Sequence, residues 1–236
     1  MKNLISNKSK DEIQAKIKEN CLILLKEFIR VADMFELTWW VDSGTLLGAC
    51  RNNKMIPWDD DIDIAMPRED YDKLRLHCVK SQFDKRKFLF QTSTTDCYFE
   101  VHAKLRLNGS TSLTERECTG RHHRGMFLDI FPLDNCPNDI NVCNDIQGFT
   151  KTFAKHTGYE KIQAFSQRFE EYNNILRSIH ERNENSNYIA NIAFWRYKKT
   201  PTMLQKSWYD DTLQIRFEDL LVNVPIGYKH VLTTLY

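Results

Sequence analysis

The segment from Asp59 to Asp63 carries four aspartates within five residues. On an extended strand, Asp61 and Asp63 project from the same face, roughly 7 Å apart along the backbone. One divalent cation, or an adjacent pair, fits between two carboxylates at this spacing, and carboxylate oxygens are the ligands that Mg²⁺ prefers. The pattern therefore predicts a site for Mg²⁺, with Mn²⁺ as the alternative ion, in which Asp61 and Asp63 are ligands. Asp59 and Asp60 take supporting roles.

Two other interpretations of this segment are weaker. A solvated acidic turn is disfavoured because Ile62 and Ile64 would anchor the opposite face of the strand in the core. A calcium loop of the EF-hand type that begins at Asp59 has Ile64 where glycine is required, and Asp70 where glutamate is usual.

A third carboxylate would complete such a metal site, and Asp129 is the best candidate. It lies between Leu128 and Ile130 in a stretch with strand composition, where an unpaired charge would be costly. The alternative is a buried aspartate that caps a loop or pairs with Arg124. Asp134 lies closer to an expected turn, which favours a structural role.

A second group of residues is suited to binding phosphate. Small and hydroxyl-bearing residues at a helix start allow a phosphate to approach the backbone N–H groups, and Gly44 lies 17 residues before Asp61. That spacing permits a strand–helix–strand unit with both ends at one rim. Basic side chains could reach the phosphates of a substrate, or be ordinary solvated or structural charges. The candidate substrate-binding residues are Ser43, Gly44, Thr45, Arg51, Lys54 and Lys104.

The elements that position these residues can be read from the hydrophobic pattern. Apolar residues recur every three or four positions after Ser9 and Glu12, which have the spacing of a capping box, and this predicts a long amphipathic helix. Pro67 suits the first turn of another helix, and Pro132 is expected to end a strand. Strands are expected over 37–41, 58–66, 98–107 and 125–131, with a helix over about 141–183. Strands interleave with helices before residue 135 and helices follow, so the predicted class is α+β.

Bulk properties set the limits of the interpretation. The 236 residues, with 42% hydrophobic and 28% charged side chains, suit one domain with a sizeable core. A net charge of +1 gives no reason to expect nucleic-acid binding. The seven cysteines form no CxxC pair, and no run of about 18 apolar residues occurs. We therefore expect a cytoplasmic protein without a transmembrane segment, which can still act at the surface of a membrane.

Three segments resemble the LicD family, which includes phosphocholine transferases, fukutin and the fukutin-related protein. They are SGTLLGACRNNKMIPWDDDIDIAMPREDYDKL at 43–74, GMFLDIFPLD at 125–134 and a divergent segment at 206–236. The resemblance implies a nucleotidyltransferase-like fold, a small mixed sheet flanked by helices, in one domain over 1–236. A catalytic core would span about 37–135, and a mainly helical part about 141–236.

The resemblance also implies roles for individual residues. Asp61, Asp63 and Asp129 match the family's metal-binding and catalytic carboxylates, and Gly44 with Thr45 matches its phosphate-binding turn. The implied activity is transfer of a phospho-alcohol, such as phosphocholine or ribitol or glycerol phosphate, from a CDP-linked donor to a carbohydrate hydroxyl. The alternatives are a nucleotide-sugar glycosyltransferase that uses the same DxD pattern, and an inactive module that binds glycans or nucleotides.

Overall fold

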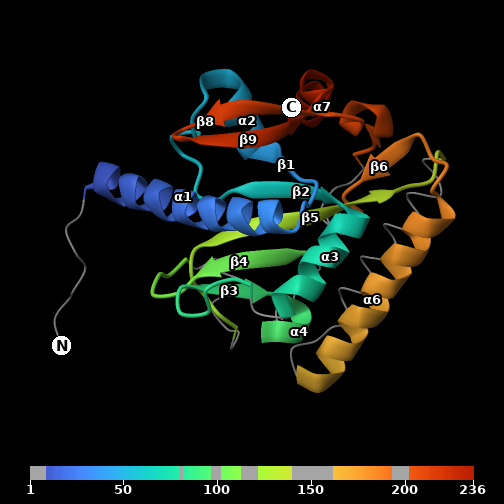
Figure 1. The fold of residues 1–236 in the computed structure, drawn as a ribbon, viewed down its shortest axis with the longest axis horizontal. Helices are drawn as coiled ribbons and strands as arrows, with labels where there is room; N and C mark the ends of the chain where they lie inside the picture. Colours follow the sequence, from blue (N-terminus) through green and yellow to red (C-terminus); the bar gives the residue numbers. More distant parts are fainter. Residues whose placement is uncertain (1–8, 80–81, 97–101, 113–121, 140–161, 193–201) are drawn as a thin grey trace.

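A mixed seven-stranded sheet forms the centre of the computed structural model, which describes residues 9–79, 82–96, 102–112, 122–139, 162–192 and 202–236 (Figure 1). Five strands follow one another in the order β1-β2-β5-β4-β3, while β6 pairs with the far end of β5, and β7 pairs with β6. Among the strands of the described residues, only the β2–β5 pair is parallel. The strands are β1 Trp40–Val41, β2 Asp63–Pro67, β3 Phe88–Gln91, β4 Ala103–Leu107, β5 Phe127–Asn135, β6 Tyr188–Ala190 and β7 Leu204–Gln205. The predicted α+β class is confirmed.

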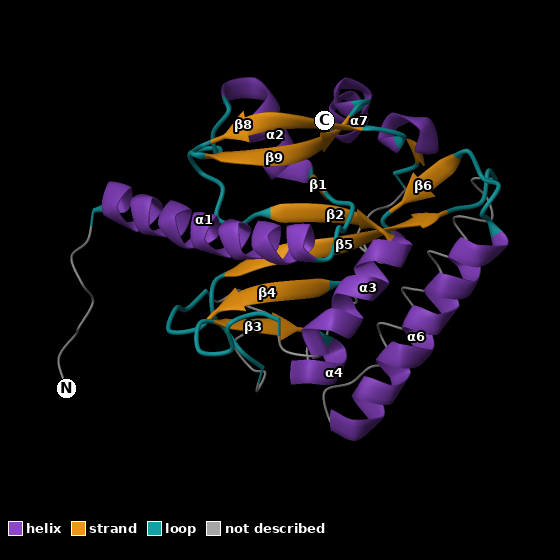
Figure 2. Cartoon of the chain, in the orientation of Figure 1, coloured by secondary structure: helices purple, strands orange, loops and turns teal. Residues whose placement is uncertain are grey.

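The helices lie around this sheet (Figures 1 and 2). Helix α1, Lys10–Met34, begins with the capping box predicted at Ser9 and Glu12, and packs with α3, Arg68–Val79, against the central strands. Helix α2, Ser43–Asn52, contacts α7, Tyr228–Leu235, and the hairpin of β8, Thr212–Phe217, and β9, Leu220–Pro225. The remaining helices are α4 Ser93–Asp96, α6 Ile162–Arg182 and the 3₁₀ turn η3 Lys206–Tyr209.

Several predicted boundaries differ from the structure. The strand expected over 58–66 begins only at Asp63, because residues 59–62 form an irregular segment, and Pro67 ends that strand instead of starting the next helix. The strand expected to stop at Pro132 continues to Asn135. It can do so because β4 pairs only as far as Ile130, so the missing N–H of Pro132 lies where β4 has ended and β6 has not begun.

The part over 141–236 that was expected to be mainly helical also contains strands. In the described residues of that range, α6 and α7 are accompanied by four strands, β6 to β9. Strand β6 extends the main sheet, and the β8–β9 hairpin buries Phe217, Val222 and Val224 in the main core. The two strands of this hairpin contain Thr, Ile, Phe and Val, which favour strands. The first part of the helix expected over 141–183 and of the strand expected over 98–107 lies outside the described residues.

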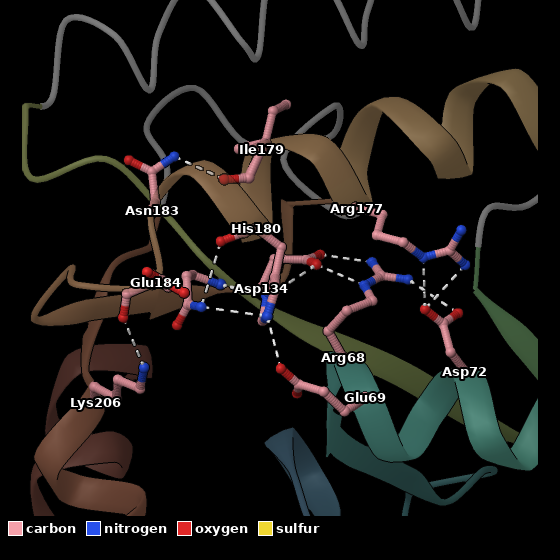
Figure 3. Close-up of polar contacts among 11 residues, drawn as sticks. Arg68, Glu69, Asp72, Asp134, Arg177, Ile179, His180, Asn183, Glu184 and Lys206 are labelled. Carbon is pink, nitrogen blue, oxygen red and sulfur yellow. Dashed lines mark hydrogen bonds and ion pairs between the residues drawn. The ribbon is translucent and has the colours of Figure 1, made fainter.

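A buried ion pair ties α3 to the end of β5 (Figure 3). Arg68 donates two hydrogen bonds to the carboxylate of Asp134, at 2.6 and 2.7 Å, and both side chains are almost wholly buried. Beside this pair, His180 of α6 contacts Glu69 at 2.9 Å and accepts a hydrogen bond from the backbone N–H of Asn135. The structural role predicted for Asp134 is thus observed, although the residue lies on the strand and not in a turn. Among the described residues, no helix combines the length and apolar composition needed to cross a bilayer.

Candidate active site

A row of charged side chains crosses three adjacent strands of the sheet. Asp63 of β2 lies in register with Asp129 of β5, which in turn lies opposite Lys104 of β4. Neighbours in register project from the same face, with strands about 4.8 Å apart. Asp61 lies just before β2, two residues before Asp63. Carboxylate oxygens of Asp61, Asp63 and Asp129 all lie within 4.8 Å of one another.

The carboxylates of this row differ in whether a neighbouring basic side chain compensates their charge. The Lys104 Nζ lies 2.6 Å from the Asp129 carboxylate, and the His102 Nε2 lies 3.2 Å from the same oxygen. Burial alone would raise the pKa of Asp129, but Lys104 and His102 outweigh burial and hold that pKa well below its usual range. Asp129 is therefore kept ionised. Its partners are these two side chains, whereas Arg124 was the partner considered from the sequence.

Asp61 and Asp63 have the opposite electrostatic environment. Burial and the neighbouring carboxylates, above all Asp129, raise the pKa of Asp61 to about 7. Burial and the charge of Asp61 raise the pKa of Asp63 well above its ordinary value. Three converging carboxylates with one compensating lysine leave an excess of negative charge that a divalent cation would offset. The donor set of hard oxygens fits Mg²⁺ or Mn²⁺, with Asp61, Asp63 and Asp129 as the residues able to hold the ion.

The start of α2 lies against these carboxylates. The Thr45 hydroxyl accepts a hydrogen bond from the backbone N–H of Asp63 at 3.0 Å, which fixes the first turn of α2 to the first residue of β2. Ser43 has a φ of 47°, in the left-handed region that non-glycine residues seldom adopt. Gly44 faces the Asp59 carboxylate so closely that an added Cβ would lie 2.6 Å from its Oδ2. Asp42 occupies the N-cap position, but its side chain makes no capping hydrogen bond.

A cavity of about 310 Å³ opens over the carboxylates. Asp129, Phe131 and Leu133 alternate along β5, so they share one face and contribute one wall. The remaining walls come from the β1–α2 junction and from the C-terminal part of the chain. The lining residues are Asp42, Ser43, Asp61, Asp63, Asp129, Phe131, Leu133, Asn191, Thr202, Leu204 and Leu235.

The predicted substrate-binding residues fall into two groups. Ser43 lines the cavity, and Gly44 and Thr45 follow it in the first turn of α2. Arg51 and Lys54 are exposed at the other end of α2, eight residues or more beyond Ser43, which is about 12 Å at 1.5 Å per residue. The structure therefore does not bring these two basic residues to the carboxylates.

Lys104 lies next to the carboxylates, but not on a solvent-facing surface. Lys104 was a candidate for binding substrate phosphate, but it is buried in β4, as is Arg106. Strand β4 lies between β3 and β5. The Lys104 Nζ lies 3.4 Å from the centre of the Phe127 ring and 2.6 Å from the Asp129 carboxylate. Its observed contact is an ion pair within the protein.

Sequence reasoning missed part of this site. Neither Asp42 nor His102 was among the predicted site residues. The wall from Phe131 and Leu133 could have been found from the period-two pattern that begins at Asp129. The remaining wall depends on how the chain after β5 returns to the sheet, which no local pattern in the sequence reveals. This wall is formed by Asn191, Thr202, Leu204 and Leu235.

Comparison with known proteins finds a family model whose match covers this site. Residues 36–135 match the family model described as the LicD/FKTN/FKRP nucleotidyltransferase domain. All three converging carboxylates and the start of α2 lie inside this range.

Curated relatives match the chain over part of their length. The lipopolysaccharide cholinephosphotransferase LicD of Haemophilus influenzae is 32% identical over 126 residues, which is 52% of this chain and 44% of that protein. The human ribitol 5-phosphate transferase FKRP is 33% identical over 88 residues, 34% of this chain and 18% of that protein. The mouse FKRP gives the same identity and coverage. The chain thus spans less than half the length of these relatives.

Proposed function

We propose that the protein is a Mg²⁺-dependent phosphotransferase, because residues 36–135 match the LicD/FKTN/FKRP nucleotidyltransferase domain. It would move a phospho-alcohol of the phosphocholine, ribitol phosphate or glycerol phosphate type from a CDP-linked donor to a carbohydrate hydroxyl. The observation that carries the proposal is the convergence of Asp61, Asp63 and Asp129 within 4.8 Å beside the start of α2. The names of the relatives, a cholinephosphotransferase and a ribitol 5-phosphate transferase, support the class of group transferred.

Each part of the site has a task in this reaction. The backbone N–H groups of the first turn of α2, with the Ser43 hydroxyl, suit the diphosphate oxygens of the donor. Asp61, Asp63 and Asp129 would hold Mg²⁺, which neutralises charge on the transferred phosphoryl group. Lys104 and His102 keep Asp129 ionised before any ion binds, so this ligand needs no deprotonation.

The transfer itself makes one bond and breaks one. The acceptor hydroxyl oxygen bonds to the phosphorus of the phospho-alcohol, the phosphoanhydride bond to CMP breaks, and the hydroxyl proton is lost to a base. The acceptor is a carbohydrate, free or lipid-linked, so we expect the protein to act in the cytoplasm or at a membrane surface.

Ligand-induced thermal stabilisation tests the proposal. The protein is titrated with CDP-choline, CDP-ribitol, CDP-glycerol and UDP-sugars, with and without Mg²⁺. A pH of 8 is chosen because the pKa of Asp61 is about 7 and its carboxylate is then mostly ionised. We expect a Mg²⁺-dependent rise in melting temperature with at least one CDP-alcohol.

Two substitutions sharpen this measurement. Asp61→Asn removes one of the three converging carboxylates and should abolish the Mg²⁺-dependent rise without unfolding the protein. Asp60→Asn removes the same charge from the neighbouring exposed position, outside that set of three, and should retain most of the rise. A rise with a UDP-sugar and none with any CDP compound would instead favour a nucleotide-sugar glycosyltransferase. Binding of a CDP-alcohol without turnover on any carbohydrate would indicate a binding module.

A further inference from the structure

The indole of Trp58 is the most exposed of the large apolar side chains in the described part of the chain, with an exposed fraction of 77%. Trp39 and Trp40, by comparison, are 3% and 4% exposed. Tryptophan is usually well buried, because its large ring gains more than most side chains from leaving water. An indole held in solvent is therefore a candidate contact for a ligand with an apolar face.

The turn that carries Trp58 is fixed, although the indole itself is exposed. The backbone N–H of Asp59 donates to the carbonyl of Ile56 at 3.0 Å. The side chain of Gln14 in α1 donates to the carbonyl of Asp59, also at 3.0 Å. Ile56 is buried and anchors the start of the turn. A ring on a fixed turn binds a ligand at a lower entropic cost than a ring on a loop that must first become ordered.

Trp58 lies close to the start of α2. The carboxylate of Asp59 approaches Gly44 so closely that an added Cβ would lie 2.6 Å from Oδ2. The Cα atoms of Trp58 and Asp59 are about 3.8 Å apart, as in any pair of consecutive residues. The first turn of α2 is where the donor diphosphate is proposed to bind. Because a single sugar separates the base of a nucleotide from its phosphates, a base joined to that diphosphate comes within reach of Trp58.

The charges beside Trp58 favour a nucleobase over a lipid surface. An exposed tryptophan suits both, because its ring can stack on a base or enter the interface of a membrane. Asp59 and the exposed Asp60 follow it directly, and an anionic lipid surface would repel their carboxylates. A pyrimidine ring is neutral and binds through its face, and Mg²⁺ would offset the charge of the diphosphate that carries it.

We propose that Trp58 binds the pyrimidine base of the CDP-linked donor, with the indole stacked on the face of the base. This inference rests on the proposed function and assigns a residue to the half of the donor that does not react. Every base has a face on which an indole can stack, so this contact adds affinity without selecting the base. Trp58 thus holds the nucleotide while the phospho-alcohol is transferred.

Calorimetric titration with CDP at saturating Mg²⁺ tests this role. Trp58→Phe keeps an aromatic ring at the position, and Trp58→Ala removes it. Inorganic pyrophosphate, which has the diphosphate but no base, is the second ligand. Leu76→Ala is the matched control, because Leu76 is another large apolar side chain, 68% exposed, on α3.

Stacking contributes about 1–3 kcal/mol per base, so Trp58→Ala should raise the Kd for CDP about 5- to 150-fold. Trp58→Phe should keep most of the affinity. The Kd for pyrophosphate should stay unchanged in both variants, and the Kd for CDP should stay unchanged in Leu76→Ala. CDP should also quench the tryptophan fluorescence of the unsubstituted protein, and Trp58→Phe should lose this quenching while it still binds CDP.

A Kd for CDP in Trp58→Ala within about twofold of the unsubstituted value would overturn the stacking role, as would an equal loss of affinity for pyrophosphate. If CDP binding were unaffected and Trp58→Ala lost binding to phosphatidylglycerol vesicles, the indole would be a membrane contact instead. Failure of the proposed function is distinguishable. The unsubstituted protein would then bind no CDP and show no Mg²⁺-dependent rise with any CDP-alcohol, and the inference would fall with it.

Discussion

The buried pair of Arg68 and Asp134 gives the sharpest prediction about stability (Figure 3). The exposed fractions of the two side chains are 2% and 0%, and two short hydrogen bonds join them. Removal of one partner from such a pair leaves a buried charge and costs about 3–5 kcal/mol of unfolding free energy. In a chain of this length, about 2–4 °C is lost per kcal/mol, so the melting temperature should fall by roughly 6–20 °C.

The two single variants should differ within that range. After Asp134→Asn, Arg68 still has Asp72 at 3.9 Å, so the cost should lie near the lower end of about 3 kcal/mol. After Arg68→Met, the buried Asp134 has the Nδ1 of His180 at 3.7 Å, but that nitrogen already accepts the N–H of Asn135. It cannot donate to Asp134 unless that bond is lost, so the cost should lie near the upper end of about 5 kcal/mol.

Urea unfolding followed by circular dichroism measures these differences. The double variant Arg68→Met/Asp134→Leu replaces both charges with apolar groups and should recover most of the lost stability. Arg86→Met, which breaks the exposed pair with Asp84, serves as the control and should have no measurable effect. If the double variant lost as much stability as the two single changes added together, the pair would not be energetically coupled and the reasoning would be refuted.

Three further predictions concern the two glycines of α2 and the contact between α3 and α6. Gly44→Ala meets only the end of the Asp59 side chain, at 2.6 Å, and should lower the melting temperature slightly while it abolishes donor-induced stabilisation. Gly48→Ala meets a backbone carbonyl at 2.5 Å, which cannot move away cheaply, and should destabilise the protein by about 1–3 kcal/mol in urea unfolding. Burial would raise the pKa of Glu69, but hydrogen bonds from the backbone and His180 lower it below the ordinary 4.5. Its contribution to stability is therefore present above pH 4.5 and lost as the pH falls through the lowered pKa, so the gap in melting temperature between Glu69→Gln and the unsubstituted protein should close below pH 4.5.

The sequence contained enough information to predict the carboxylates that meet, but not their different environments. Asp61 and Asp63 follow from spacing alone, and Asp129 from the cost of a charge in an apolar strand. The partner of Asp129 could not be predicted, because Lys104 comes from a strand 25 positions earlier whose register with β5 is set by tertiary pairing. Arg51 has the residue type expected of a phosphate ligand, but the length of α2 carries it away from the site.

The arrangement of charges explains how four carboxylates can line one cavity while the protein stays folded. Lys104 compensates Asp129 from the neighbouring strand, and raised pKa values let Asp61 and Asp63 bind protons when no cation is present. The site can therefore exist in a protonated form with low charge and an ionised form suited to a divalent cation. Binding a divalent cation would favour the ionised form, because it offsets the charge of the three grouped carboxylates.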